Sequence, residues 1–417
     1  MTSPAGDVRA EVAAWLAAAW DPDLSLREWR ERLADSGWGA PGWPREWCGR
    51  GLPPAAAAVV AQELARAGAP GAPEGSGMSL AGPTILAHGS DELKRRFIRP
   101  TVTGEIGWCQ LFSEPGAGSD LAGLTTTARR ADGGGWVVSG QKVWSTSAHH
   151  ADAGLLLART DWDVPRHRGI SYFILPMRQP GVEVRPLRQM NGYASFNEVF
   201  LDEAVVPPPN VIGEVGGGWA VALTTLAHER RLAPPAARAG PGPRPGPGRA
   251  RREAAAETER VMAPYRWYPQ RAGRPDLVIE RAVAAGRHTD PLVRQEIVRL
   301  ITLAWSARWT AQRAAAARAA GRPPGPEGSL AKLAGSNIAR AAARAHALIA
   351  GPASMLAGAD DPAGGMLSEI LLSVPAVSIA GGTDQVQRTI VAERILGLPR
   401  ETSADRDVPF GKVRRSG

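Results

Sequence analysis

A chain of 417 residues is long enough for a buried core and for one large domain or two to three ordinary ones. With 44% hydrophobic and 22% charged residues, the composition is that of a globular protein and excludes an intrinsically disordered chain. The formal charge of +8 does not indicate a nucleic-acid partner, because only four of the 49 basic residues are lysines and the arginines are interleaved with acids. We expect a solvated basic surface instead.

Three further features predict the compartment. No run of about 18 apolar residues occurs that could span a membrane. The N-terminal residues lack the basic segment and apolar block of a secretory signal. The two cysteines, Cys48 and Cys109, make neither a disulfide framework nor a Cys-rich metal site. We therefore expect a cytoplasmic protein with no membrane association.

Residues 1–105 predict an N-terminal helical domain. Apolar residues recur there at helical spacing in four segments: 7–20, 24–38, 53–69 and 90–104. Ser90 precedes the acidic start of the last segment, and we expect its side chain to cap that helix.

Between residues 106 and 212 the apolar period changes to two, which predicts β-strands. Residues 124–131 and 136–146 flank the Gly-rich turn 132–135 and predict a hairpin. Further strands are expected at 153–160, 170–177, 182–188 and 195–203. The region is predicted to be a sandwich- or barrel-like β domain of roughly seven short strands.

Helical spacing returns in residues 213–400, with segments at 218–233, 291–320, 329–351 and 383–396, and residues 401–417 form a tail. The order of helices, β domain and a bundle resembling four helices predicts an α+β fold and excludes a Rossmann core. Within an irregular insert, 233–275, residues 233–258 are rich in Pro, Gly and Arg. They predict a disordered surface loop that cannot continue a helix, and a local reading-frame error is the alternative.

Three segments carry polar groups suited to binding a ligand. Residues 108–120, WCQLFSEPGAGSD, join an apolar strand to a Gly-rich turn whose N–H groups can receive an anion. Residues 142–147, KVWSTS, place an aromatic side chain beside hydroxyls at a strand end. Residues 379–388, IAGGTDQVQR, contain a Gly turn that opens a helix, with Thr383 as the expected N-cap. Each segment alone is also explained by an ordinary loop, a strand with a core Trp, or a capped helix.

Together, in this order and spacing, the segments resemble the signatures of the acyl-CoA dehydrogenase family. WCQLFSEPGAGSD resembles the first signature, QKVWSTSA the flavin-side strand and GGTDQVQRTIVAERILGLPR the C-terminal signature. Residues 325–335, GPEGSLAKLAG, are similar to an actinobacterial branch of the family. The resemblance implies a helix–β–helix architecture. It also implies an FAD enzyme that removes two hydrogens across the Cα–Cβ bond of an acyl-CoA thioester and passes electrons to an electron-transfer flavoprotein.

The resemblance also implies the binding residues. Flavin contacts are expected from Gln110, Phe112, Ser113, Trp144, Ser145 and Thr146, and from Gly382, Thr383 and Gln385 on the C-terminal side. Gly118 and Ser119 are expected near the flavin pyrophosphate. Ser119 and Arg230 are expected next to the substrate, with Ser119 beside the CoA arm.

The candidate base departs from the common family pattern. Many members carry a glutamate directly before the Gly-Thr of the C-terminal signature, where this chain has Gly381. Other members place the base on a helix of the C-terminal domain, directly before an arginine, and Glu229 followed by Arg230 fits that alternative. A solvated ion pair is the competing interpretation of Glu229. A base for this reaction needs apolar surroundings that raise its pKa, because the acyl-CoA α-proton is weakly acidic.

A second departure concerns assembly. The family's cross-subunit Arg-x-x-Phe-Gly segment is absent, and QRAG at 270–273 is a poor substitute. We expect a homodimer or homotetramer, or a heteromer with a homologue. The alternatives to a dehydrogenase are a non-catalytic or half-competent subunit of a hetero-oligomer, and a flavin oxidase, monooxygenase or desulfinase on the same fold.

Other chemistries are not indicated. His149 and His150 have no spaced acidic partner, so no metal site is expected. No G-x-S-x-G or Walker pattern occurs, which removes the common hydrolase and nucleoside-triphosphatase alternatives.

Overall fold

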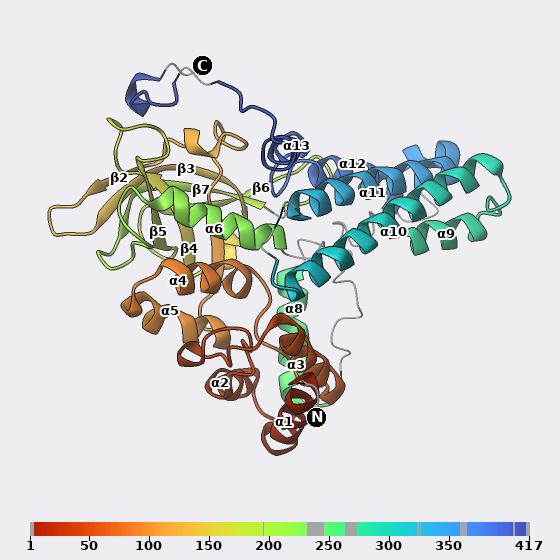
Figure 1. Cartoon of the computed structure of the whole chain (residues 1–417), viewed down its shortest axis with the longest axis horizontal. Helices are drawn as coiled ribbons and strands as arrows, with labels where there is room; N and C mark the ends of the chain where they lie inside the picture. The colour runs from red at the N-terminus through yellow and green to blue at the C-terminus, as the bar shows by residue number, and fades with distance from the viewer. Residues whose placement is uncertain are drawn as a thin grey trace.

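The computed structural model describes residues 4–194, 196–231, 246–262, 273–322, 325, 327–358, 365–402 and 405–413. N-terminal helices, a β domain and a second group of helices follow one another along the chain (Figure 1). The α+β fold expected from the sequence is confirmed. Among the described helices, none has the length and apolar character needed to cross a membrane.

The N-terminal region is helical as predicted. It contains α1 (Pro4–Ala19), α2 (Leu26–Ser36), α3 (Pro54–Ala67), η2 (Gly77–Ala81), α4 (Gly82–His88) and α5 (Asp91–Thr103). The predicted cap is confirmed, because the Ser90 side chain accepts a hydrogen bond from Leu93 N. The π-helical turn η2 and helix α4 were not expected, since Gly77, Gly82 and Pro83 are residues typical of loops.

A seven-stranded sheet forms the β domain. Its strands are β1 (Trp108–Leu111), β2 (Thr127–Arg130), β3 (Trp136–Thr146), β4 (Ala153–Arg159), β5 (Ile170–Pro176), β6 (Val182–Leu187) and β7 (Phe196–Val206). The strand order is β1-β4-β2-β3-β7-β6, and β5 also pairs with β4. The predicted hairpin is present as β2 and β3, which pair Arg130 with Trp136. Both Gly134 and Gly135 in its turn have positive φ, which explains the Gly-rich sequence there.

Two clusters of buried side chains lie against the sheet. One joins β1, β4 and β5 to α4, α5 and α6 (Gly218–Arg231), and includes Phe112, Leu155 and Tyr172. The second lies under β3, β4, β5 and β7 and includes Val138 and Phe173. Helix α6 therefore packs on the β domain, where it contacts β5 (Figure 1).

The remaining helices form the C-terminal bundle. They are α9 (Pro275–Ala284), α10 (Pro291–Ala319), α11 (Glu327–Ala350), α12 (Met366–Val377) and α13 (Asp384–Arg394). Helix α11 lies at the centre, because it contacts all four of the others. After α13 the chain runs back to the β domain, where a short 3-10 turn, η8 (Phe410–Lys412), ends the described part (Figure 1).

One expectation for the insert is wrong. The sequence predicts an irregular segment over 233–258, but residues from 249 on belong to α8 (Arg249–Met262), which packs on α2. This part has no Pro or Gly and is rich in Ala, Glu and Arg, which favour helix. Glu253 accepts a hydrogen bond from Leu26 N, and Glu257 pairs with Arg30. Residues 232–245 lie outside the described residues.

Candidate active site

The first signature and the flavin-side strand meet at one point of the sheet. Val143 N donates a hydrogen bond to Ser113 O over 2.9 Å, so Ser113 lies beside the end of β3 that carries residues 144–146. Segments about 30 residues apart in the sequence thus form one surface, as the resemblance implies.

A buried ion pair fixes this junction, and no sequence pattern predicted it. Lys142 Nζ lies 2.9 Å from Glu114 Oε1 and donates to Phe112 O over 3.1 Å. Glu114 also accepts hydrogen bonds from Thr125 N and Thr126 N. Burial alone would raise the pKa of Glu114, but Lys142 and the other donors outweigh it and lower the pKa to about 2. The carboxylate therefore stays ionised and holds the loop that follows β1.

The end of β3 has an unusual backbone. Trp144 has φ 61, a left-handed conformation that is strained for this residue type, and its side chain is 56% exposed. Its ring lies edge-on to Phe196 at 5.6 Å. The next residue, Ser145, is buried, and its Oγ has no hydrogen-bond partner among the described residues. The exposed Trp144 ring is suited to packing against a planar ligand, whereas the Ser145 hydroxyl lies in the interior.

Glu229 lies near the end of α6 and points to the same region. Gln110 Nε2, on β1, donates a hydrogen bond to Glu229 Oε2 over 3.4 Å. A Cβ atom built on Gly381 would lie only 3.7 Å from Glu229 Oε1. The carboxylate on α6 therefore lies in van der Waals contact with the point where a side chain at position 381 would begin.

Buried hydroxyl groups hold α6 in place beneath this carboxylate. Thr225, one helical turn before Glu229, lies within hydrogen-bond distance of Tyr172 Oη (3.0 Å) and of Thr84 Oγ1 (2.9 Å). Burial raises the pKa of Tyr172, and the negative charge of Glu229 raises it further. The hydrogen bond with Thr225 lowers the pKa but does not outweigh these two effects. Tyr172 therefore remains a neutral hydroxyl in the interior near Glu229.

The C-terminal signature forms a tight turn at the start of α13. Gly381 and Gly382 have φ +66 and +89, which favour glycine. The predicted N-cap is confirmed, because the Thr383 side chain accepts a hydrogen bond from Val386 N. Asp384 is buried, which opposes its ionisation, but donors from α11 outweigh this and lower its pKa. Those donors are Ser336, Lys332 and Arg340, at 2.7, 3.1 and 3.0 Å.

Most of the expected site residues fall into two places. Gln110, Ser113, Trp144, Ser145 and Thr146 surround the β1–β3 junction, while Gly381, Gly382 and Thr383 lie at the α13 turn, which Glu229 connects to β1. Phe112 is buried edge-on to Tyr172, so its backbone is the part left to face a ligand. Gly118, Ser119 and Gln385 are exposed. The Arg230 side chain lies outside the described part.

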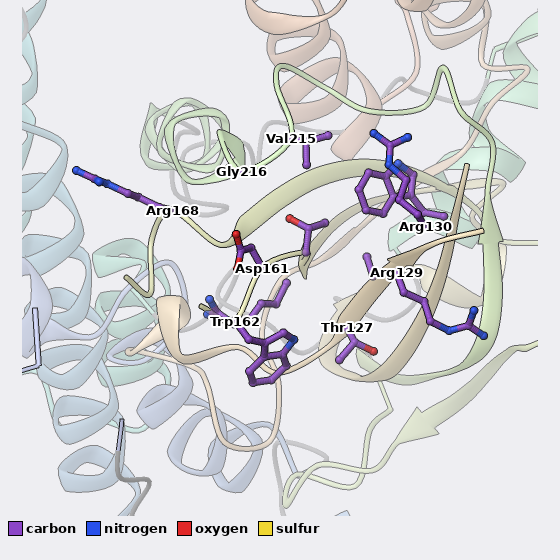
Figure 2. Close-up of a pocket in the computed structure, with 12 residues that line it drawn as sticks. Thr127, Arg129, Arg130, Asp161, Trp162, Arg168, Val215 and Gly216 are labelled. Carbon is purple, nitrogen blue, oxygen red and sulfur yellow. The ribbon is translucent and has the colours of Figure 1, made fainter. Parts of the chain in front are cut away.

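A cavity of about 690 Å³ opens elsewhere on the β domain. Figure 2 shows Arg129, Arg130 and Trp162 among the side chains around it. None of the expected site residues lines this cavity, so it is separate from the junction around Glu229. No cluster of His, Cys, Asp and Glu in the described part could hold a metal ion, His149 and His150 included.

Three family models match the chain. They are acyl-CoA dehydrogenase, N-terminal domain, over residues 6–105; middle domain, over 109–204; and C-terminal domain, over 278–396.

Two curated relatives come from Mycobacterium tuberculosis. Acyl-CoA dehydrogenase FadE34 is 39% identical over 400 residues, which cover 94% of this chain and 49% of that protein. The chain therefore spans about half the length of FadE34. Acyl-CoA dehydrogenase IpdE1 is 36% identical over 381 residues, covering 90% of this chain and 88% of that protein.

Two similar solved structures each name two proteins in their descriptions. The Tcur3481-Tcur3483 steroid ACAD has a TM-score of 0.67 and 26% identity, and covers 96% of this chain and 99% of that chain. The ChsE4-ChsE5 complex from Mycobacterium tuberculosis has a TM-score of 0.65 and 27% identity, with the same coverage.

Proposed function

Because the chain belongs to the acyl-CoA dehydrogenase family, we propose that it catalyses α,β-dehydrogenation of an acyl-CoA thioester with Glu229 as the base. The chain is an FAD-dependent oxidoreductase. The observation that carries the proposal is the position of the Glu229 carboxylate, which lies beside Gln110 and 3.7 Å from the Cβ position of residue 381.

The residues at the β1–β3 junction fit FAD. The exposed face of Trp144 suits the ring system. The Gly381–Gly382 backbone leaves room for close approach at the start of α13, where a helix N-terminus favours an anionic or polar group. When bound, FAD supplies the acceptor for the hydride that leaves the β-carbon.

Glu229 would take the α-proton of the thioester. Its anchor on α6 differs from position 381, but its Oε1 lies 3.7 Å from the Cβ position of residue 381, which supports one role for the two anchors. Gln110 would hold the second carboxylate oxygen and leave Oε1 toward the turn. Charge that develops on the thioester oxygen requires hydrogen-bond donors fixed near it, and Ser119 and Arg230 are proposed on the substrate side.

The finer assignments follow the family and its relatives. We propose that electrons leave through an electron-transfer flavoprotein. A steroid-derived acyl group is the first to test, because a similar solved structure is described as a steroid ACAD. The proposed domain limits are 1–105, 106–212 and 213–400, followed by the tail 401–417; the family-model matches support this division.

The second candidate is a subunit whose site is completed by a homologue. Gly381, which lacks the common base, favours it. Similar structures come from complexes of two named proteins, and FadE34 is about twice as long as this chain. In this case the chain purified with its homologue would be active and the chain alone would not.

The test is an anaerobic titration of the FAD-bound protein with a panel of steroid-derived, straight-chain and branched acyl-CoAs, followed by flavin absorbance. We expect one class to bleach the flavin and to yield the 2-enoyl-CoA. The protein alone and the protein with a homologue encoded nearby are compared in parallel. No bleaching in either preparation would contradict the proposal, and stoichiometric peroxide with a good acyl-CoA in air would favour an oxidase.

A further inference from the structure

The C-terminal segment after α13 is attached to the β domain by backbone hydrogen bonds. Phe410 N donates to Val164 O over 2.9 Å, and Gly411 N donates to Trp162 O over 2.8 Å. Residues Pro165 and Pro409 form an antiparallel bridge beside them. The segment 405–413 therefore adds a short strand-like contact to the loop that follows β4.

The buried side chain of Phe410 packs under this contact, against Arg159 and Trp162. Its side chain is only 2% exposed, and the centre of its ring lies 3.5 Å from the guanidinium carbon of Arg159 and 5.4 Å from the centre of the Trp162 ring. Arg159, at the end of β4, is fully buried. A buried guanidinium stacked on an aromatic face is strongly stabilised when both are shielded from water.

Arg159 in turn holds the segment that follows the Gly-rich turn of the first signature. Its guanidinium donates to Ala122 O over 2.8 Å and to Leu124 O over 3.2 Å, at the turn η3 (Leu121–Gly123). A third hydrogen bond goes to Arg166 O. Arg159 thus connects the ring of Phe410 directly to the backbone that follows residues 118–120.

The loop that follows β4 makes a second contact, with Asp120 at the end of the Gly-rich turn. The Arg166 guanidinium donates to both carboxylate oxygens of Asp120, each over 3.1 Å. The first half of the Gly-rich turn is held by the backbone pair Glu114–Ala117, whose N–H groups each donate to the other residue's carbonyl oxygen over 3.1 and 3.0 Å. Gly118 lies beyond this pair, and a Cβ built on it would meet no atom of the described residues within 4 Å. Residues 118–120 therefore lie between the Glu114–Ala117 pair on one side and the contacts of Arg166 and Arg159 on the other, and the second side leads to the loop covered by the C-terminal segment.

We propose that residues 405–413 are a strap that holds the 118–120 loop in its binding position, with Phe410 and Arg159 as positioning residues. The proposal rests on the function proposed above only in assigning this loop to FAD and acyl-CoA binding. The strap acts by keeping Arg159 aligned with the carbonyls of Ala122 and Leu124.

The test compares Phe410→Ala, a chain ending at Thr402 and the control Lys412→Ala, which changes an exposed side chain of the same segment. Hydrogen exchange of the FAD-bound protein is measured for the peptide covering residues 116–126. We expect Phe410→Ala and the shortened chain to speed exchange there by about ten-fold, the scale of a desolvated cation–π contact. Exchange in β7 and α11 and the behaviour of Lys412→Ala should match the wild type.

Kinetics with the best acyl-CoA provide a second measurement. The apparent KM should rise in Phe410→Ala and in the shortened chain, while kcat at saturation stays within a few-fold of the wild type. Hydrogen exchange at residues 116–126 that stays at the wild-type rate would contradict the proposed role of residues 405–413. A uniform increase in exchange over the whole chain would contradict it as well. Failure of the proposed function is distinguishable, because it appears as an unreduced flavin in the wild type and leaves the exchange comparison intact.

Discussion

The Glu229 carboxylate and the Gly381 turn come from segments about 150 residues apart, yet they share one small space. A glutamate at 381 would begin in van der Waals contact with the Glu229 carboxylate, so two negative charges would lie close together. The glycine at 381 also suits the positive φ of the turn.

Replacing Glu229 by Gln tests the base directly. The change keeps the shape and the contact with Gln110 but removes the charge, so FAD should remain bound while flavin reduction by acyl-CoA slows by about 10²–10⁴. Anaerobic stopped-flow absorbance measures this rate. Glu214→Gln, on an exposed residue just before α6, is the matched control and should react like the wild type. A Glu229→Gln rate within a few-fold of wild type would place the base elsewhere.

Moving the carboxylate tests whether the two anchors are interchangeable. In Glu229→Ala with Gly381→Glu, the new side chain starts from the vacated space and should restore part of the flavin reduction lost in Glu229→Ala. The positive φ at 381 makes this variant less stable by about 1–2 kcal/mol, which thermal unfolding can verify. A double variant as slow as Glu229→Ala, but folded and yellow, would contradict a shared position.

The sequence was sufficient to nominate Glu229, since position 381 lacks a side chain and Glu229-Arg230 matches the alternative pattern. It did not predict that Gln110 hydrogen-bonds this carboxylate, because β1 and α6 meet only in the folded chain. The Glu114–Lys142 pair was likewise missed, since no spacing in the sequence relates a loop residue to a residue in the middle of β3.

At the scale of elements, the Glu114–Lys142 pair joins the loop after β1 to β3. Lys142→Met leaves a buried carboxylate without its cation, so the free energy of unfolding should fall by about 3–5 kcal/mol. Urea unfolding measures the loss. Lys94→Met, which removes an ion pair with exposed Asp91, should cost no more than about 1 kcal/mol. Equal effects of the two variants would show that the buried pair has no special role.

His346 on α11 gives the bundle a dependence on pH. The residue is buried, neither ring nitrogen has a partner among the described residues, and burial together with nearby Arg281 lowers its pKa to about 4. The native state therefore binds this proton less readily than the unfolded chain, whose histidine has a pKa near 6.5. The stability contribution is complete above about pH 6.5 and declines as the pH falls toward 4, by about 3 kcal/mol in all.

Unfolding in urea between pH 7 and pH 4, for the wild type and His346→Leu, measures this effect. The stability difference between the two proteins should grow in favour of His346→Leu as the pH falls, because leucine cannot take up a proton. A difference that is constant over this range would show that His346 does not titrate on unfolding.

Helix ends and turns could be predicted from the sequence where the preferences of a few neighbouring residues determine them. The Ser90 and Thr383 caps and the Gly-rich hairpin turn follow from side-chain and φ preferences of a few residues, and all three are present. Helix α8 was missed because the Pro and Gly residues before it dominate the composition of the insert. Its docking depends on Glu253 and Glu257 reaching α2, a contact across more than 200 residues.

At the scale of the whole molecule, helix α10 presents large apolar side chains to solvent in the described chain. Val298, Trp305 and Trp309 lie on one face of α10, and each side chain is more than half exposed. The spacing of seven and four residues keeps them on one stripe of the helix. Exposed aromatic side chains at this density are typical of protein–protein interfaces, and they support an oligomer formed through the C-terminal bundle.

Negative charges introduced on this face of α10 should separate the subunits. Trp305→Glu with Trp309→Glu places two carboxylates in the interface, so light scattering should show a monomer where the wild type is a dimer, a tetramer or a heteromer with a homologue. Met355→Glu, which charges an exposed apolar residue on η6 (Gly351–Met355), is the control and should keep the wild-type mass. If flavin binding is completed by a neighbouring subunit, the monomer should also lose FAD on dilution, which flavin fluorescence detects. A double variant with wild-type mass and flavin content would exclude this face of α10 as the interface.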